Sequence, residues 1–178
     1  MGKKLEELDN KLIDFIEKQK IFFVGTAASI GNVNISPKGM DTFRILNSKK
    51  IIWLNLTGSG NETAAHLMKN SRMTIMFCAF EDKPLILRLY GTAYIFHKRN
   101  PEYHQYIHLF PKMDGSRQII EMDIDFVQTS CGYAVPFMEF KGERTQLKSW
   151  AEKQGEERLE EYWKEKNTRS IDDFETGI

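Results

Sequence analysis

The sequence predicts a mainly β protein, an antiparallel barrel of about six or seven short strands with a few peripheral helices. Segments rich in β-branched and aromatic residues follow one another at hairpin spacing between residues 21 and 96. Turn sequences such as SIGN, NSKK and EDKP separate these segments. Long helices do not alternate with the strands, so the parallel sheet of an α/β protein is not expected.

The chain is expected to begin with an amphipathic helix over residues 1–20. Apolar residues recur there at helical spacing between lysines and glutamates, and they are Leu5, Leu8, Leu12, Phe15 and Ile16. The strands that follow are predicted from IFFVGTAA, VNIS, FRIL, IIWLNL, RMTIMFCAF and LILRLYGTAYIF, with one or two more in SRQIIEMDIDFVQTSCGYAVP. The segment PKGMD between VNIS and FRIL is predicted to be a turn.

Three further helical segments are expected. A short helix over residues 61–70 follows the loop TGSGNET, and a second helix spans residues 101–110, with Pro101 at a tolerated first-turn position. Residues 143–166 predict a polar helical hairpin that breaks at Gly155, and the tail after it is expected to be loosely ordered. The predicted organisation is therefore an N-terminal helix (1–20), a barrel domain (21–136) and a C-terminal helical extension packed on the barrel (137–178).

Composition narrows the class of protein. The 178 residues include 25 Lys and Arg and 25 Asp and Glu, so no basic stripe for nucleic acid is expected. No run of about 18 apolar residues predicts a membrane span, and the charged N-terminus lacks the apolar core of a signal peptide. Cys78 and Cys131 fit no zinc spacing and are interpreted as reduced thiols. We therefore expect a soluble cytoplasmic protein.

The loop Thr57–Thr63, TGSGNET, allows two interpretations. It lacks the lysine of a P-loop and the third glycine of a dinucleotide fingerprint. Backbone N–H groups at the helix start that follows, with nearby hydroxyls, would favour a phosphate. Alternatively, Ser59 and Glu62 form a capping box, or Asn61 is the N-cap, and the same N–H groups need no ligand.

Other candidate residues carry weaker signals. Lys38 in SPKG follows a strand and can reach an anion as a point charge. In LILRLYGTAYIF, period-two alternation places Arg88 on the face opposite Leu87, Leu89 and Gly91. His104 and His108 have the spacing of a two-histidine metal face but no third ligand, so no metal site is predicted.

Four segments together carry a resemblance to a known family: VGTAASIGNVNISPKGMDTFRIL, LTGSGNETAAHLMKNSRMTIMFCAF, LRLYGTA and RQIIEMDIDFVQTSCGYAVP. The chain resembles the pyridoxamine 5′-phosphate oxidase-like family of FMN-binding split-barrel proteins over residues 21–136. It is most similar to a branch of FMN-binding proteins distinct from the true vitamin-B6 oxidase. The resemblance implies a six-stranded antiparallel split barrel with N- and C-terminal helices, assembled as a homodimer with FMN at the subunit interface.

The resemblance also implies where the flavin binds. The family's phosphate lysine falls on Lys38, with Ser36, Pro37 and Gly39 beside the flavin. The second phosphate segment falls on the loop Thr57, Gly58, Ser59, Gly60, Asn61 and Thr63. The oxidases carry serine, arginine and lysine where this chain has Asn61, Glu62 and Thr63, so two positive charges are missing. Arg88 and Arg117 are candidates to replace them, and Arg117, Gln118, Cys131 and Tyr133 are candidates for the pocket or the dimer contact.

These implications predict an FMN-dependent oxidoreductase whose substrate is a small molecule. No catalytic residue is assigned, because the cofactor carries the redox chemistry. Two alternatives remain open: a non-catalytic flavin-binding sensor or carrier, and a split barrel that holds a deazaflavin or a haem with His104 or His108 as axial ligand.

Overall fold

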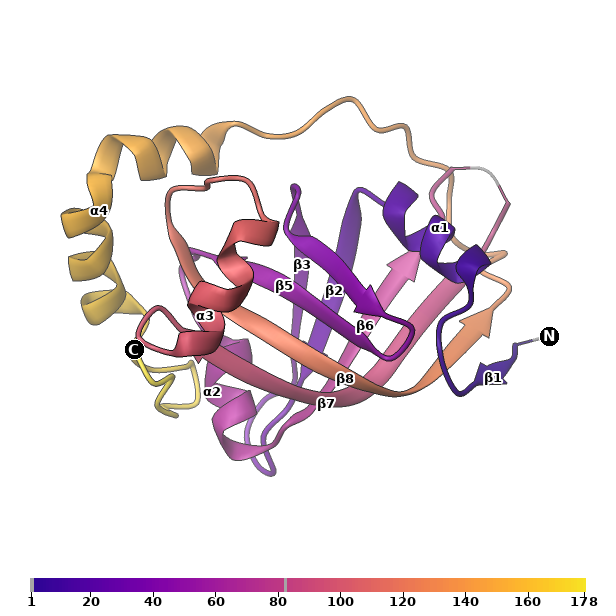
Figure 1. The fold of residues 1–178 in the computed structure, drawn as a ribbon, viewed down its shortest axis with the longest axis horizontal. Helices are drawn as coiled ribbons and strands as arrows, with labels where there is room; N and C mark the ends of the chain where they lie inside the picture. The colour runs from indigo at the N-terminus through magenta and orange to yellow at the C-terminus, as the bar shows by residue number, and fades with distance from the viewer. Residues whose placement is uncertain (1, 82) are drawn as a thin grey trace.

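A computed structural model describes residues 2–81 and 83–178 and shows a curled antiparallel sheet flanked by helices (Figure 1). Seven strands follow the order β3-β2-β6-β7-β8-β5-β4, and the short β1 pairs with β8. The predicted mainly β split barrel is confirmed. Its sheet has eight strands instead of six, because the N-terminal residues add β1 and the barrel itself uses seven.

The bounds of the elements follow the chain. The strands are β1 (Lys4–Leu5), β2 (Ile21–Thr26), β3 (Asn34–Gly39), β4 (Phe43–Asn47), β5 (Lys50–Leu56), β6 (Arg72–Cys78), β7 (Ile86–His97) and β8 (Ser116–Ser130). The helices are α1 (Asn10–Lys18), α2 (Glu62–Lys69), α3 (Pro101–Tyr106), a 3-10 turn η1 (Ile107–Leu109) and α4 (Gln146–Lys166).

The first helix is shorter than the predicted span of residues 1–20. It begins at Asn10, because the Asp9 side chain accepts a hydrogen bond from the backbone N–H of Leu12 at 2.9 Å and caps the helix there. Leu5 lies in β1 instead and is paired with Val127 of β8. The apolar stripe was identified correctly, since Leu12 and Ile16 are buried against the barrel.

The core lies inside the curl of the sheet and is built by alternation along the long strands. Leu87, Leu89 and Ala93 of β7 are buried on one face, whereas Arg88 and Tyr90 lie on the other. β8 is one strand of 15 residues, where the sequence allowed one or two. The two long strands, β7 and β8, lie side by side in the middle of the sheet, and the other strands lie on either side of them (Figure 1).

The predicted turn PKGMD begins later than expected, because Pro37, Lys38 and Gly39 are part of β3. β3 lies at one edge of the seven-strand path and pairs only with β2 along it, with Phe23 opposite Pro37. An edge strand tolerates a proline, which has no N–H to donate. The side chains of β3 are thereby fixed in register at the rim of the barrel.

The helices lie around the barrel rim. In Figure 1, α2 is below the sheet, α3 and α4 are on the left, and α1 is on the right. A strap (residues 137–145) crosses the top of this view between β8 and α4. The predicted break of the last helix is confirmed, since Gly155 has non-helical dihedral angles inside α4. Among the described residues, no helix is long and apolar enough to cross a membrane.

Candidate functional site

A polar hollow of about 530 Å³, which we call the cradle, lies between β3, the loop after β5 and the start of α2. It brings together many residues that the sequence singled out. These are Ser36, Pro37, Lys38, Gly58, Ser59, Gly60, Asn61, Thr63 and Arg117. Strand β3 supplies the first three, and Arg117 enters from the second position of β8. Segments about 80 residues apart in sequence therefore meet at one site.

The start of α2 faces the cradle without a side-chain cap. The predicted capping box is wrong, because the helix begins at Glu62 and Asn61, not Ser59, occupies the N-cap position. The Asn61 side chain makes no capping hydrogen bond. The Glu62 carboxylate instead accepts the backbone N–H of Ile171 at 3.1 Å. The first-turn N–H groups are consequently not capped by any described side chain, and the helix dipole favours an anion beside them.

Two cations share the cradle, and neither has an acidic partner. Burial and the nearby Arg117 charge lower the pKa of Lys38 to about 8. Burial also lowers the pKa of Arg117 to about 10, well above neutrality, so its guanidinium stays charged. Within the described part of the chain, no carboxylate forms an ion pair with either residue. Lys38, which is half-buried, and the buried Arg117 therefore leave positive charge in the cradle that Glu62, although it lines the same hollow, does not neutralise by an ion pair.

The guanidinium of Arg117 is held in place by neutral acceptors. Its Nη1 donates to the Gly60 carbonyl at 3.2 Å and to Asn167 Oδ1 at 2.5 Å. Arg117 Nε is buried and has no partner in the described residues. Because neither acceptor is a carboxylate, the full positive charge of Arg117 remains available to a ligand in the cradle.

Two further cradle residues, His66 and Asn55, were missed by the sequence analysis. His66 is 1% exposed, and its Nδ1 lies 3.1 Å from Thr26 Oγ1. Its Nε2 and the Asn61 Nδ2 are buried without a partner among the described residues. Asn55 Nδ2 donates to Asn61 Oδ1 at 3.4 Å and so helps to orient that amide. Such polar atoms are costly to bury unless a ligand or water satisfies them.

The segment after α4 covers the cradle, although the sequence predicted it to be loosely ordered. Asn167 is fully buried and donates to the Gly58 carbonyl at 3.1 Å. Asp172 accepts two hydrogen bonds from Asn32, both at 2.7 Å. These contacts join residues more than 100 positions apart, which no local pattern reveals. The segment therefore holds the glycine loop in its observed conformation.

Five predicted site residues lie outside the cradle. Thr57 accepts the Trp163 indole N–H at 2.8 Å and so attaches α4 to the barrel. Gln118 is buried behind the cradle and accepts from Asn55 Nδ2 at 2.9 Å. Arg88 lies on the outer sheet face, where its Nη1 donates to Ser130 Oγ at 3.1 Å. Tyr133 is 83% exposed, and Gly39 lines a different cavity.

The region behind Gln118 predicts a pH effect on stability. Burial, together with the nearby Arg99 and Arg117 charges, lowers the pKa of His97 to about 4. Below pH 6.5 the unfolded chain binds a proton that folded His97 does not, so stability falls as the pH decreases from 6.5 towards 4. Between pH 7.0 and pH 4.5, the free energy of unfolding should fall by about 2 kcal/mol less in His97→Gln than in the wild type. Urea titrations at the two pH values measure this difference.

The matched control is His108→Gln, because His108 is exposed on η1. That variant should keep the acid sensitivity of the wild type. If the stability of His97→Gln falls with decreasing pH as much as that of the wild type, His97 is not the cause of the acid sensitivity.

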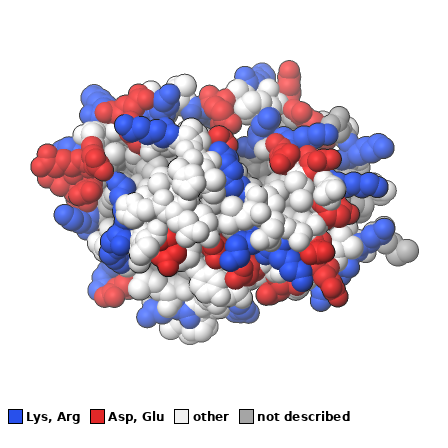
Figure 2. Space-filling view, viewed as in Figure 1, with Lys and Arg blue, Asp and Glu red and all other residues white. Residues whose placement is uncertain are grey.

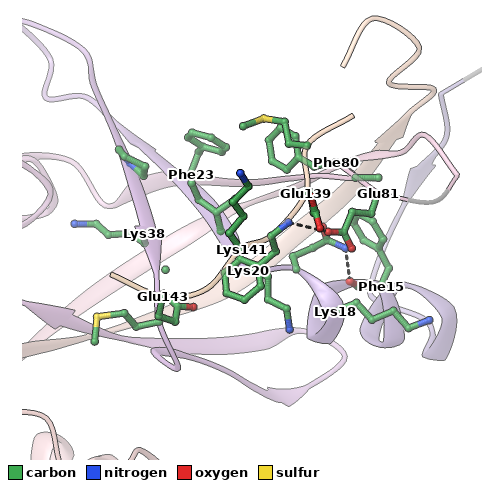
Figure 3. Close-up of a pocket in the computed structure, with 18 of the residues that line it drawn as sticks. Phe15, Lys18, Lys20, Phe23, Lys38, Phe80, Glu81, Glu139, Lys141 and Glu143 are labelled. Carbon is green, nitrogen blue, oxygen red and sulfur yellow. Dashed lines mark hydrogen bonds between the residues drawn. The ribbon is translucent and has the colours of Figure 1, made fainter. Parts of the chain in front are cut away.

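A second, larger cavity of about 1390 Å³ adjoins the cradle (Figure 3). Pro37 and Lys38 line both hollows, so β3 forms the boundary between them. Across the described residues, no group of three His, Cys, Asp or Glu side chains is arranged to hold a metal ion. His104 and His108 are both exposed, and neither lines the cradle.

Comparisons with known proteins give a consistent result. A family model described as pyridoxamine 5′-phosphate oxidase matches residues 8–131. The chain is 35% identical over 187 residues to the pyridoxamine 5′-phosphate oxidase family protein ustO of Aspergillus flavus, covering 94% of this chain and 74% of ustO.

Two solved structures show the same fold at low identity. HupZ of Group A Streptococcus is similar with a TM-score of 0.55 and 21% identity, over 67% of this chain and 91% of HupZ. The FAD binding protein of Mycobacterium smegmatis is similar with a TM-score of 0.50 and 8% identity, over 71% of this chain and 97% of that protein.

Proposed function

The chain belongs to the pyridoxamine 5′-phosphate oxidase family, and from this premise we propose that it is a flavoprotein that binds FMN for an oxidoreductase reaction. One observation carries the proposal. Lys38, Arg117 and the uncapped start of α2 converge on one cradle, and among the described residues neither cation is paired with a carboxylate, since Glu62, which also lines the cradle, is bonded to Ile171 instead. The fold shared with an FAD binding protein of Mycobacterium smegmatis supports a flavin as the ligand.

The residues of the cradle fit the terminal phosphate of FMN. A phosphate monoester carries nearly two negative charges at neutral pH, which matches the two cations. Unpartnered donors on Asn61 and Arg117 would complete the hydrogen bonds that such a ligand needs. The hydroxyls of Ser36 and Thr63 line the same hollow.

In the proposed mechanism the protein binds and orients, and bound FMN supplies the hydride or electron acceptor. Lys38 and Arg117 hold the negative charge, and the glycine loop lets the backbone approach it closely. Asn167 would hold Arg117 and the glycine loop in position, and Ile171 lines the cradle beside them. Because Pro37 and Lys38 also line the larger cavity, a ligand held in the cradle lies beside the space where a reaction partner can bind.

We further propose that the protein is a cytoplasmic homodimer with FMN at the subunit interface. Three large apolar side chains of the β2–β3 hairpin are strongly exposed in the single chain: Ile30 (72%), Val33 (72%) and Ile35 (69%). Val33 also lines the cradle, so a partner covering the hairpin would lie next to the flavin. Cys78 and Cys131 are both free thiols, which suits a reducing compartment.

The absorption spectrum of freshly purified protein, followed by mass spectrometry of the released cofactor, tests the proposal. FMN should give flavin bands and the mass of the mononucleotide. A Soret band or a deazaflavin mass would contradict it, as would a colourless protein that does not quench FMN fluorescence. Reduction by NAD(P)H separates the enzyme from a carrier or sensor without turnover, which would bind FMN but not pass on electrons.

Lys38 predicts a pH dependence of FMN binding. Only the protonated amine attracts the phosphate, and its pKa in the free protein is about 8. Wild-type affinity should therefore begin to fall as the pH rises above 8. We expect Lys38→Gln to bind FMN about 10- to 100-fold more weakly at pH 7 and to lose this pH dependence. Fluorescence quenching titrations at pH 7.0 and 9.5 measure both effects.

Two variants serve as controls for the Lys38 experiment. Lys38→Arg should keep its affinity at pH 9.5, because the guanidinium stays protonated. Lys69→Gln removes an exposed charge at the far end of α2 and should leave binding unchanged. If Lys38→Gln retains the wild-type pH profile, Lys38 does not contact the phosphate.

A further inference from the structure

Apart from β3, the larger cavity is bordered by elements that do not contribute to the polar cradle. Helix α1, residues 79–81 and 83–85 and the strap surround it, and β2 and β3 provide its floor. Figure 3 shows Phe15, Phe23 and Phe80 among the lining side chains, with Lys141 of the strap lying between Phe23 and Phe80 in this view. At about 1390 Å³ the cavity exceeds the range of roughly 300–1,000 Å³ that is usual for a small-molecule site.

The lining of this cavity combines aromatic rings with an excess of positive charge. Along the described part of the lining, basic side chains outnumber acidic ones by seven to four. Among the described residues, none of the seven basic side chains forms an ion pair. Lys20 Nζ instead lies 5.7 Å from the centre of the Phe140 ring. One acid is also engaged, because Glu81 accepts the backbone N–H of Phe140 at 3.1 Å.

The strap covers the cavity and makes few hydrogen bonds to the other described residues. Apart from the Glu81 contact, its backbone is joined to residues 79–81 by the hydrogen bond from the Met138 N–H to the Phe80 carbonyl, at 3.0 Å. Gly142 has a φ of +140°, and a side-chain carbon at that position would meet nothing within 4 Å. A molecule can therefore enter by displacing a segment that is held by a small number of bonds.

The charge, the aromatic walls and the volume specify one class of ligand. A purely apolar molecule would gain nothing from the positive charge along the lining, and a small inorganic anion would leave the phenylalanines in contact with water. We propose that the cavity binds an amphipathic organic anion, a carboxylate with an aromatic or extended apolar body. If FMN occupies the cradle as proposed above, this anion is the reaction partner of the flavin, since Lys38 separates the two hollows.

The test compares two probes of the same shape, naphthalene-2-carboxylate and the uncharged 2-naphthalenemethanol. Isothermal titration calorimetry on the full chain, with and without FMN, should give a dissociation constant at least about 10-fold lower for the carboxylate. Lys141→Glu should abolish that preference while the alcohol binds as before. The matched control, Lys153→Glu, makes the same charge change on an exposed face of α4 outside the cavity and should keep the preference.

The outcomes separate this inference from the proposed function. Carboxylate preference without any FMN binding supports the organic-anion site and contradicts the flavoprotein. Equal binding of the two probes, or no binding of either, overturns the inference and leaves the FMN proposal intact. Mutual exclusion of naphthalene-2-carboxylate and FMN also overturns it, because the cavity would then belong to the flavin itself.

Discussion

Arg117→Gln is expected to lower the affinity for FMN by about 100-fold or more. A guanidinium can make two charge-assisted hydrogen bonds to a phosphate, each contributing about 1.5–3 kcal/mol. Arg117 is 4% exposed, and its described partners are neutral, so its charge is not compensated within the protein. Fluorescence quenching titrations with FMN measure the change, and thermal unfolding of the same sample confirms that the variant is folded.

Two variants sharpen the Arg117 experiment. Arg117→Lys keeps the charge but not the planar fork, and its affinity should fall between those of the wild type and the glutamine variant. Arg158→Gln removes an exposed arginine of α4 that lies outside the cradle and should bind FMN normally. A folded Arg117→Gln protein with affinity within about threefold of the wild type would show that the phosphate binds elsewhere.

Gly91→Ala is expected to destabilise the fold by about 3 kcal/mol or more. A side-chain carbon at Gly91 would lie 1.9 Å from the backbone oxygen of Asp123 and 2.9 Å from the methyl carbon of Met122. The close approach occurs where the register of β7 and β8 shifts between Tyr90 and Gly91. Because the obstacle is backbone at the centre of the sheet, it cannot move aside as a flexible side chain would.

Gly25→Ala is the matched control for Gly91→Ala. Gly25 also lies inside a strand, but a side-chain carbon there would meet its nearest neighbour, the Thr74 backbone oxygen, at 3.7 Å. That distance is an ordinary contact, so the variant should be about as stable as the wild type. Urea unfolding followed by tryptophan fluorescence compares the two variants. Similar losses of stability in both would contradict the steric explanation.

The sequence predicts the barrel because its signal is local. Alternation of apolar residues along β7 identifies the buried face, and the turns between strands limit the possible pairings. β1 is different, since two residues pair with β8 mainly through their backbone and leave no pattern of their own. The part of β3 around Pro37 is equally hard to predict from the sequence, because a proline is tolerated only in an edge strand. Whether a strand lies at the edge depends on the whole sheet.

The candidate site, too, can be predicted only where its residues carry a local sequence signal. Lys38 and the glycine loop have recognisable neighbours in sequence, and the structure places both at the cradle. His66 is a single histidine on a mostly apolar helix, a pattern typical of an ordinary core residue. The role of Glu62 was misinterpreted because its partner, the N–H of Ile171, is 109 positions away. Contacts of that separation depend on the finished fold and have no periodic signature.

The cover of the cradle has a consequence for the order in which the protein is made. Asn167, which holds Arg117 and the glycine loop, follows Arg117 by 50 residues. At a synthesis rate of about 5–20 residues per second, a ribosome needs roughly 3 to 10 seconds to add them. During that interval a nascent chain contains every basic group of the cradle but not its cover. The candidate site of a growing chain therefore lacks the contacts of Asn167 and Ile171 until the last segment has been made.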